Sequence, residues 1–186
     1  MRYQDLSSFT LPKNFRGKSS FIVILWWSVQ NILFAWSPQP LFKWRNFLLR
    51  LFGAQIGKNV NIRPTTKITY PWKLKIGDNC WIGDNCDLYN LGEITIGNNV
   101  ALAHRVYLCT GNHDYTKSTF DILSQNIRIE DEVWLPNDVF IGPGVTVGKG
   151  CVIGTRSTVL SNMPEGMICF GYPAKPIRKR LTKNIK

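Results

Sequence analysis

Residues 129–159 read IEDEVW LPNDVF IGPGVT VGKGCV IGTRST V, and this stretch repeats with a period of six residues. An aliphatic residue opens each hexapeptide, and a valine or a small residue stands four positions later. Such a short fixed period indicates a solenoid, because one unit cannot bury its apolar side chains alone and must stack on its neighbours. We therefore predict a mainly β fold: a prism of short parallel strands with one hexapeptide on each face and both columns pointing inward.

The same register extends towards the N-terminus as far as Ile56. The step from Ile56 to Ile76 is 20 residues, whereas the step from Ile129 to Val147 is 18, so the early coils carry two extra residues at one corner. Glycine and asparagine recur just after the aliphatic residue, at corners whose unusual backbone angles they tolerate. All seventeen aliphatic positions of the repeat are Ile, Leu or Val: Ile56, Ile62, Ile68, Leu74, Ile76, Ile82, Leu88, Ile94, Ile96, Leu102, Leu108, Ile129, Leu135, Ile141, Val147, Ile153 and Val159.

Residues 1–53 lie outside the repeat and form the first of two predicted domains, a tail followed by two amphipathic helices; residues 54–186 form the second. An apolar, Trp-rich stretch at residues 21–36 is shorter than the ~20 apolar residues that a spanning helix needs. It is interpreted either as a helix buried against the domain or an oligomer partner, or as a helix in the headgroup region of a membrane. The second helix is predicted to have Ser37 as its N-cap and Pro38 in its first turn.

The 186-residue chain holds 23 Lys and Arg against 12 Asp and Glu, a net charge of +11. This balance favours an anionic partner, but nothing in the repeat resembles a nucleic-acid-binding module, so no nucleic acid is expected. Three of the five cysteines, Cys80, Cys86 and Cys151, fall in the small inward column and are predicted to be packing residues. Without a CxxC pair or a secretory signal peptide, we expect a cytoplasmic protein, peripheral to the inner face of the membrane if the N-terminal helices bind lipid.

The hexapeptides stop after Leu108 and resume near Ile127. The long polar segment between them should project as a loop, and loops of this length are usually functional. His113 stands at the root of the loop, where it is a candidate general base or a residue that binds the loop backbone. The only other histidine, His104, is expected at the surface. Two histidines are too few for a three-histidine zinc site, and no metal is expected.

Three stretches carry a closer likeness: Tyr70–Leu74, Tyr89–Gly97 and Cys109–Tyr115. With the hexapeptide register, they resemble the left-handed parallel β-helix acyltransferases, and most closely the colanic-acid and capsule-type sugar O-acetyltransferases. The resemblance covers roughly residues 54–180. It implies a left-handed coil, although parallel crossovers are ordinarily right-handed. It also implies acetyl-CoA as co-substrate, a saccharide acceptor, and a homotrimer with its sites between subunits.

The resemblance further implies which residues surround the acceptor. His113 would deprotonate the acceptor hydroxyl, whose oxygen then attacks the thioester carbonyl of acetyl-CoA. Asn85 would contact the acceptor, although it is equally explained as a corner asparagine. Asn90 falls where related enzymes often carry an acidic substrate contact, and its neutral amide departs from that pattern. The other expected neighbours of the acceptor are Tyr89, Asp114 and Tyr115.

For acetyl-CoA, the resemblance implies a groove along the regular coils. Backbone groups and small corner residues would bind the pantetheine there, and the basic C-terminal segment would bind the phosphates through charge-assisted hydrogen bonds. Pro136 departs from the family pattern, since proline has no N–H to offer the cofactor. The residues expected to bind acetyl-CoA are Trp134, Asn137, Gly142, Thr155, Lys175 and Arg178.

We therefore expect an acetyl-CoA-dependent O-acetyltransferase that transfers acetyl directly to a sugar hydroxyl. Its acceptor is expected to be a saccharide of a surface polysaccharide such as colanic acid, capsule or exopolysaccharide. Two alternatives stay open: an N-acetyltransferase of an amino sugar or a xenobiotic, and a catalytically silent β-helix scaffold.

Overall fold

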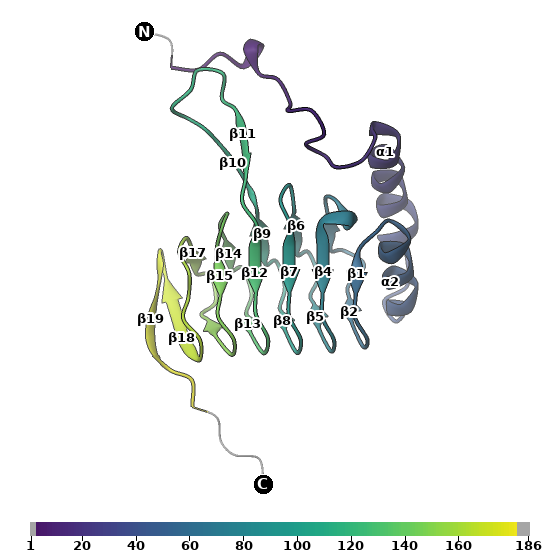
Figure 1. The fold of residues 1–186 in the computed structure, drawn as a ribbon. Coiled ribbons are helices and arrows are strands. Elements are labelled where there is room, and N and C mark those ends of the chain that lie inside the picture. Colours follow the sequence, from purple (N-terminus) through teal and green to yellow (C-terminus); the bar gives the residue numbers. More distant parts are fainter. Residues whose placement is uncertain (1–2, 182–186) are drawn as a thin grey trace.

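The structure, a computed structural model, describes residues 3–181. Three sheets, parallel except for the last strand of one of them, form a three-sided prism whose coils stack along one axis (Figure 1). Face A consists of β1 (Gln55–Ile56), β4 (Leu74–Ile76), β7 (Ile94–Ile96), β12 (Ile127–Ile129) and β15 (Thr146–Val147). Face B consists of β2 (Asn61–Ile62), β5 (Trp81–Ile82), β8 (Ala101–Leu102), β13 (Trp134–Leu135), β16 (Val152–Ile153), β18 (Met167–Gly171) and β19 (Ala174–Lys179). Face C consists of β3 (Lys67–Ile68), β6 (Asp87–Tyr89), β9 (Tyr107–Cys109), β14 (Phe140–Ile141) and β17 (Thr158–Val159).

The inward aliphatic column is confirmed, because all seventeen of its side chains are buried and belong to one core cluster. The change of period is also visible in the strand pairing. Ile76 pairs with Ile96 across a 20-residue coil, and Ile129 pairs with Val147 across an 18-residue coil. Aliphatic residues one coil apart in the sequence therefore lie next to each other in the sheet, and the apolar column is continuous along the prism.

Glycine and asparagine at the corners serve different purposes. Asn59, Asn79 and Asn99 have φ values of 53° to 57°, in the left-handed region that asparagine tolerates. Gly77 and Gly97 have no positive φ; a Cβ at Gly77 would lie 2.8 Å from the carbonyl carbon of Gly97 in the next coil. The expectation that these glycines supply unusual backbone angles is therefore wrong, since they are required by the close approach of neighbouring coils.

The cysteines of the small column are packing residues, as predicted. Cys80, Cys86 and Cys151 are free thiols in the core. Burial raises the pKa of Cys86 to about 11 and that of Cys151 to about 12. Because the thiolate is the reactive form, these side chains are poor nucleophiles at neutral pH.

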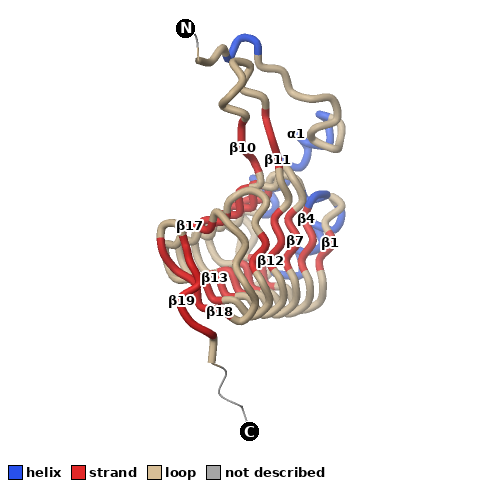
Figure 2. Tube along the Cα trace, turned by 60° about the vertical axis from the view of Figure 1, so that its left-hand side comes forward, coloured by secondary structure: helices blue, strands red, loops and turns tan. Residues whose placement is uncertain are grey.

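Two helices cap the N-terminal end of the prism, α1 (Ser20–Val29) and α2 (Phe42–Leu51) (Figures 1 and 2). A π-helical turn (Gln30–Phe34) continues α1, and short 3₁₀ turns cover Leu6–Ser8 and Pro71–Lys73. The indole Nε1 of Trp26 donates a hydrogen bond to the Ile68 carbonyl oxygen (2.8 Å), which ties α1 to the first coil. No helix among residues 3–181 is long and apolar enough to cross a membrane.

The predicted start of the second helix is wrong. Ser37 does not cap α2, which begins at Phe42 instead. The Ser37 hydroxyl accepts a hydrogen bond from Nη1 of the buried Arg45 (2.8 Å), and Arg45 Nε donates to the Ile62 carbonyl oxygen (2.7 Å). Arg45 thus supplies hydrogen bonds to the turn before α2 and attaches the helix to the prism. A local capping rule does not predict this role, because it depends on a contact with a residue distant in the sequence.

Candidate active site

A hairpin carries His113 out of the prism at the corner between faces C and A. Its strands are β10 (Gly111–His113) and β11 (Ile122–Ser124), which pair in antiparallel fashion and project beyond the coils (Figure 1). The hairpin interrupts the repeat where the sequence predicts a projecting loop. The N-terminal segment lies along it, with the Asp5 N–H donating to the Ser118 carbonyl oxygen (2.7 Å).

The imidazole of His113 is held by the hairpin itself. Its Nδ1 lies 2.8 Å from the carbonyl oxygen of Phe120. A carbonyl only accepts, so Nδ1 is the protonated nitrogen in this pair and Nε2 carries the free lone pair. The His113 ring stacks on the Phe120 ring at 4.1 Å with an interplanar angle of 8°, and Phe9 packs at 6.1 Å. This arrangement fixes the tautomer and the orientation of the imidazole, as general-base catalysis would require.

Asp114 does not orient His113. Its carboxylate accepts hydrogen bonds from the N–H and hydroxyl of Thr116, and these bonds lower the pKa of the Asp114 carboxyl. Tyr115 is the next residue and is exposed at the hairpin surface. Tyr89 lies at the hairpin root, where its ring would be 2.7 Å from a Cβ placed on Gly111. Tyr89, Asp114 and Tyr115 are thus grouped on the same corner as His113.

Asn90 is a structural amide. Its side chain is completely buried, its Oδ1 accepts from the Tyr70 N–H (2.8 Å), and its Nδ2 donates to the Tyr70 carbonyl oxygen (2.6 Å). Both ends of the amide are therefore occupied by the backbone of the preceding coil. We do not carry Asn90 forward as an acceptor contact.

Replacing Asn90 with alanine is expected to lower the free energy of unfolding by about 2–4 kcal/mol, because the buried N–H and C=O of Tyr70 would both lose their partner. Urea denaturation measures the loss. Thr155→Ala, at an exposed corner, serves as the control and should cost less than about 0.5 kcal/mol. A loss below about 1 kcal/mol in Asn90→Ala, accompanied by a raised KM for the acceptor, would contradict the structural role.

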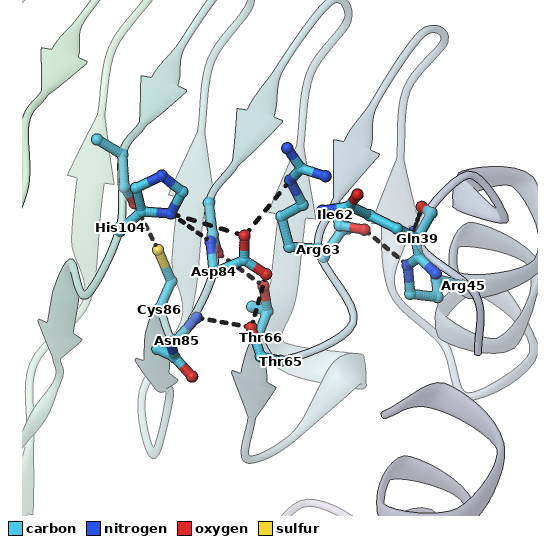
Figure 3. Close-up of polar contacts among 12 residues, drawn as sticks. Gln39, Arg45, Ile62, Arg63, Thr65, Thr66, Asp84, Asn85, Cys86 and His104 are labelled. Atoms are coloured by element: carbon cyan, nitrogen blue, oxygen red, sulfur yellow. Dashed lines mark hydrogen bonds and ion pairs between the residues drawn. The ribbon is translucent and has the colours of Figure 1, made fainter. Parts of the chain in front are cut away.

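A second group of predicted residues lies on another corner, between faces B and C. Asn85, Asn137 and Thr155 all lie at this corner; the coil of His104 separates that of Asn85 from that of Asn137, and Thr155 follows one coil later. Asn85 has a φ of 57°, and its N–H donates to Thr65 Oγ1 (2.9 Å) (Figure 3). No bond to the Asn85 carboxamide is seen within residues 3–181, whereas Asn137 Oδ1 accepts from the His104 N–H (3.1 Å). His113 and Asn85 are therefore on different corners of the same prism.

A polar cluster at this corner was not predicted from the sequence. Arg63 Nε lies 3.6 Å from Asp84 Oδ2, and the Nδ1 of the half-exposed His104 accepts from the Asp84 N–H (3.1 Å) (Figure 3). The cluster borders a cleft of about 340 Å³ that Trp81 and Phe42 also line. The sequence did contain a signal for this cluster. Arg63, Asp84 and His104 are spaced by about one coil each, and residues one coil apart lie at the same corner.

The expected acetyl-CoA residues are divided between elements. Trp134 is half-exposed on β13, whereas Gly142 lies on the hairpin corner and its N–H donates to the Val159 carbonyl oxygen (2.9 Å). Lys175 and Arg178 are exposed on β19. Lys175 pairs with Phe170 of β18, and Arg178 pairs with Ile168, because the register of the two strands shifts between Ile168 and Cys169. Phe170 and Ile168 are two residues apart and share one side of β18, so both cations lie on the outer side of the β18–β19 ribbon.

Two further features bear on cofactors. Arg180 Nη1 donates to the carbonyl oxygens of Glu132 and Gly150 (3.0 Å each), so this basic residue anchors the end of β19 to the coils. Across residues 3–181, no three His, Cys, Asp or Glu side chains cluster in a way that could hold a metal ion.

Comparison with known proteins agrees with this architecture. A family model described as bacterial transferase hexapeptide (six repeats) matches residues 126–161. A protein of Escherichia coli (strain K12) named for colanic acid biosynthesis as the acetyltransferase WcaF is 55% identical over 178 residues, which cover 96% of this chain and 98% of that protein. The galactoside O-acetyltransferase of Escherichia coli (strain K12) is 32% identical over 138 residues, covering 73% and 68%.

Solved structures show the same fold. A hexapeptide-repeat acetyltransferase of Vibrio cholerae, complexed with acetyl coenzyme A, superposes with a TM-score of 0.80 at 23% identity and covers 89% of this chain and 92% of that one. A galactoside acetyltransferase in complex with coenzyme A also gives 0.80, at 24% identity, covering 91% and 84%. The fold is the predicted left-handed parallel β-helix. With a relative 55% identical along almost its whole length, this chain belongs to the hexapeptide-repeat acetyltransferases.

Proposed function

We propose that this chain is an acetyl-CoA-dependent O-acetyltransferase that acetylates a sugar hydroxyl in the biosynthesis of a surface polysaccharide. The observation that carries the proposal is the geometry of His113, whose Nδ1 binds the Phe120 carbonyl oxygen and whose Nε2 is left as the base. The relative named for colanic acid biosynthesis supports the saccharide class of the acceptor. Acetyl-CoA as the donor agrees with the neighbour solved with acetyl coenzyme A.

In the proposed reaction, His113 Nε2 takes the proton of the acceptor hydroxyl while the oxygen attacks the thioester carbonyl carbon. The Phe120 carbonyl oxygen stabilises the imidazolium that forms, since it accepts from Nδ1–H. Backbone N–H groups would stabilise the oxyanion of the tetrahedral intermediate. The carbon–sulfur bond then breaks, and the CoA thiolate takes from Nε2 the proton that the acceptor hydroxyl gave up.

We propose a homotrimer with each site between two subunits. His113 and Asn85 lie on the two corners that flank face C, so one chain does not bring them together. Face C carries the outward side chains of Tyr107 and Phe140, whose ring centroids are 5.4 Å apart, and the exposed Leu160 directly follows its last strand. Packing face C around a threefold axis would bring the hairpin of one subunit to the Asn85 corner of the next.

The cations of β19 are proposed to bind the phosphates of CoA. Lys175 and Arg178 share the outer side of the ribbon, and within residues 3–181 neither forms an ion pair with an acidic side chain. Changing both to alanine is expected to raise the KM for acetyl-CoA by about tenfold and to leave kcat within about twofold, because the contact is made equally in ground and transition states.

Initial rates over a range of acetyl-CoA concentrations measure this change. Lys179→Ala is the matched control, because Lys179 pairs with Met167 and lies on the opposite side of the ribbon. An unchanged KM in the double variant would remove these residues from the cofactor site.

The proposal extends to the cellular location. The five cysteines are free, which supports a reducing compartment and hence the cytoplasm. Peripheral contact with the inner face of the membrane through residues 1–53 would bring the enzyme to lipid-borne acceptors.

Acetyl-CoA turnover with a panel of saccharides tests the function. The purified protein is incubated with acetyl-CoA and with neutral sugars, amino sugars and deacetylated polysaccharide fragments, and thiol release and the site of acetylation by NMR are recorded. An ester on a sugar hydroxyl is expected. Exclusive amide formation would favour the N-acetyltransferase, and no turnover with any acceptor would favour the silent scaffold.

A further inference from the structure

The net charge of the chain is concentrated at one end. Residues 6–77 hold eleven Lys and Arg and no Asp or Glu, which equals the net +11 of the whole chain. The remaining residues contain twelve basic and twelve acidic side chains and are neutral as a set. Residues 6–77 comprise the N-terminal helices and the first coil, at the end of the prism that α1 and α2 cover (Figure 1). Arg63 and Lys75 of this set pair with Asp84 and Glu93 of the following coils, and the other nine cations leave this end of the prism positive.

The outer surface of this end is apolar. We define the helical cap as residues 20–51, one side of which packs on the first coil through buried residues such as Trp26 and Phe34. The other side leaves large side chains in solvent, and Ile32 and Trp36 are 65% and 85% exposed. The exposed apolar side chains of the cap are Phe21, Ile24, Leu25, Trp27, Ile32, Leu33, Trp36, Leu41, Trp44, Phe47 and Leu51.

Cations border this apolar surface on α2. Lys43, Phe47 and Arg50 follow one another at the spacing that places helix residues side by side. A cleft of about 600 Å³ lies between α2 and the corner that joins β1 to β2. Lys43, Arg50 and Lys58 line it together with the exposed Trp44. The Arg50 guanidinium donates to the carbonyl oxygens of Ile56 and Gly57, whereas the ammonium groups of Lys43 and Lys58 form no ion pair within residues 3–181. The backbone N–H of Lys58 donates to Asp78 Oδ1 (2.7 Å).

We propose that the helical cap docks on the surface of a membrane that contains anionic phospholipid. The exposed Trp, Ile and Leu side chains would enter the headgroup region, and Lys43 and Lys58 would bind lipid phosphates in their cleft. Tryptophan beside lysine and arginine is the composition of interfacial helices, and each basic residue near an anionic bilayer adds attraction. A second copy of the chain is a poorer occupant, since two caps facing each other would oppose their positive ends.

In the proposed trimer, three helical caps would contact the membrane together. The trimer and the inner face of the membrane as its location rest on the proposed function. If face C packs along a threefold axis, the three prisms run parallel to it, and all three caps face the same way. Three weak sites then bind one planar surface together, and the effective affinity exceeds that of a single cap. The hairpins with His113 project sideways from the prism, away from the capped end, so docking leaves them free (Figure 1).

Vesicle flotation of the full chain tests the proposal. Vesicles of phosphatidylcholine alone are compared with vesicles containing about 30 mol% phosphatidylglycerol, whose headgroup is anionic. Binding to the anionic vesicles is expected, with a steep loss in 0.5 M salt, where charges are screened within about 4–5 Å. Lys43→Gln with Lys58→Gln should lower the partition coefficient about 25-fold, at about fivefold for each charge removed.

A separate variant tests the apolar contribution of the helical cap to membrane binding. Trp36→Ser should weaken binding by about tenfold, since it removes a large exposed side chain from the headgroup region. The matched controls lie elsewhere on the prism: Leu181→Ser, with an exposed fraction of 84% at the far end, and Lys149→Gln, on a corner of the regular coils. Both should bind like the unmodified protein.

The outcomes separate this proposal from the enzymatic one. No binding to anionic vesicles, equal binding to neutral vesicles, or equal loss in the control variants would overturn the docking surface. A change in molar mass by light scattering on Trp36→Ser would assign the cap to a contact between copies, which also overturns it. Acetyl transfer to a soluble acceptor is measured on the same samples, so a chain that transfers acetyl but does not float disproves docking alone.

Discussion

His113→Ala is expected to lower kcat for acetyl transfer by a factor of about 10³, with the KM for acetyl-CoA changed by less than about twofold. General base catalysis by a positioned histidine contributes about 10²–10⁴, and here the histidine is held ready by the Phe120 carbonyl oxygen and the stacked Phe120 ring. The remaining activity would come from the bound geometry of the two substrates and from backbone groups at the oxyanion.

The measurement is steady-state thiol release at saturating acetyl-CoA, with thermal melting to show that the hairpin is retained. Lys117→Ala is the control for the same hairpin, since its exposed side chain pairs with Asp121 and does not touch the imidazole. It should stay within about twofold of the unmodified rate. If His113→Ala kept more than about a tenth of the activity, another group would have to be the base, and the proposed mechanism would fail.

Mixing two inactive variants is expected to restore activity. His113→Ala lacks the proposed base, and Asn85→Gly lacks the proposed acceptor contact but can adopt the φ of 57° that this corner requires. If each site takes His113 from one subunit and Asn85 from the next, random trimers of the two variants contain intact sites. With equal mixing, each required residue is present with probability one half, so about one quarter of the sites in random trimers are intact, and every trimer that contains both variants has one intact site of its three.

Co-expression with two affinity tags, followed by tandem purification, isolates mixed trimers for the assay. The control mixes His113→Ala with the double variant His113→Ala/Asn85→Gly, in which no site can have a base. Activity in the first mixture near the level of either parent would show that the two residues do not meet across subunits. The structure motivates the test because the residues occupy separate corners of one prism.

For the coils, the fold predicted from the sequence agrees closely with the structure. Each aliphatic position from Ile56 to Val159 is buried as its register predicts, and the 20- and 18-residue coils appear as such in the strand pairing. The reason for corner glycines was different: Gly77 and Gly97 avoid contact with the next coil and do not supply a rare backbone angle. That reason requires knowing which backbone lies beside them, which a single repeat does not contain.

The candidate site was less accessible to sequence. The projecting segment and its histidine follow from the interrupted repeat, but the partner of His113 Nδ1 is a backbone carbonyl seven residues away. Asn90 was expected near the acceptor from its place in a family motif, yet its amide is fully used by Tyr70. Hydrogen bonds to backbone atoms leave no compositional trace, since every residue type offers the same carbonyl and N–H.

The sequence by itself determined the solenoid, the location of its interruption and the membership of the cysteines in the packed column. These depend on a period, and a period places each side chain relative to its neighbours one coil away without further information. Only the tertiary structure decided which side of the N-terminal helices stays in solvent, how Arg45 replaces the expected cap of α2, and that His113 and Asn85 lie on different corners. Those outcomes depend on contacts between residues far apart in the chain, where local propensity gives way to packing and to the satisfaction of buried polar groups.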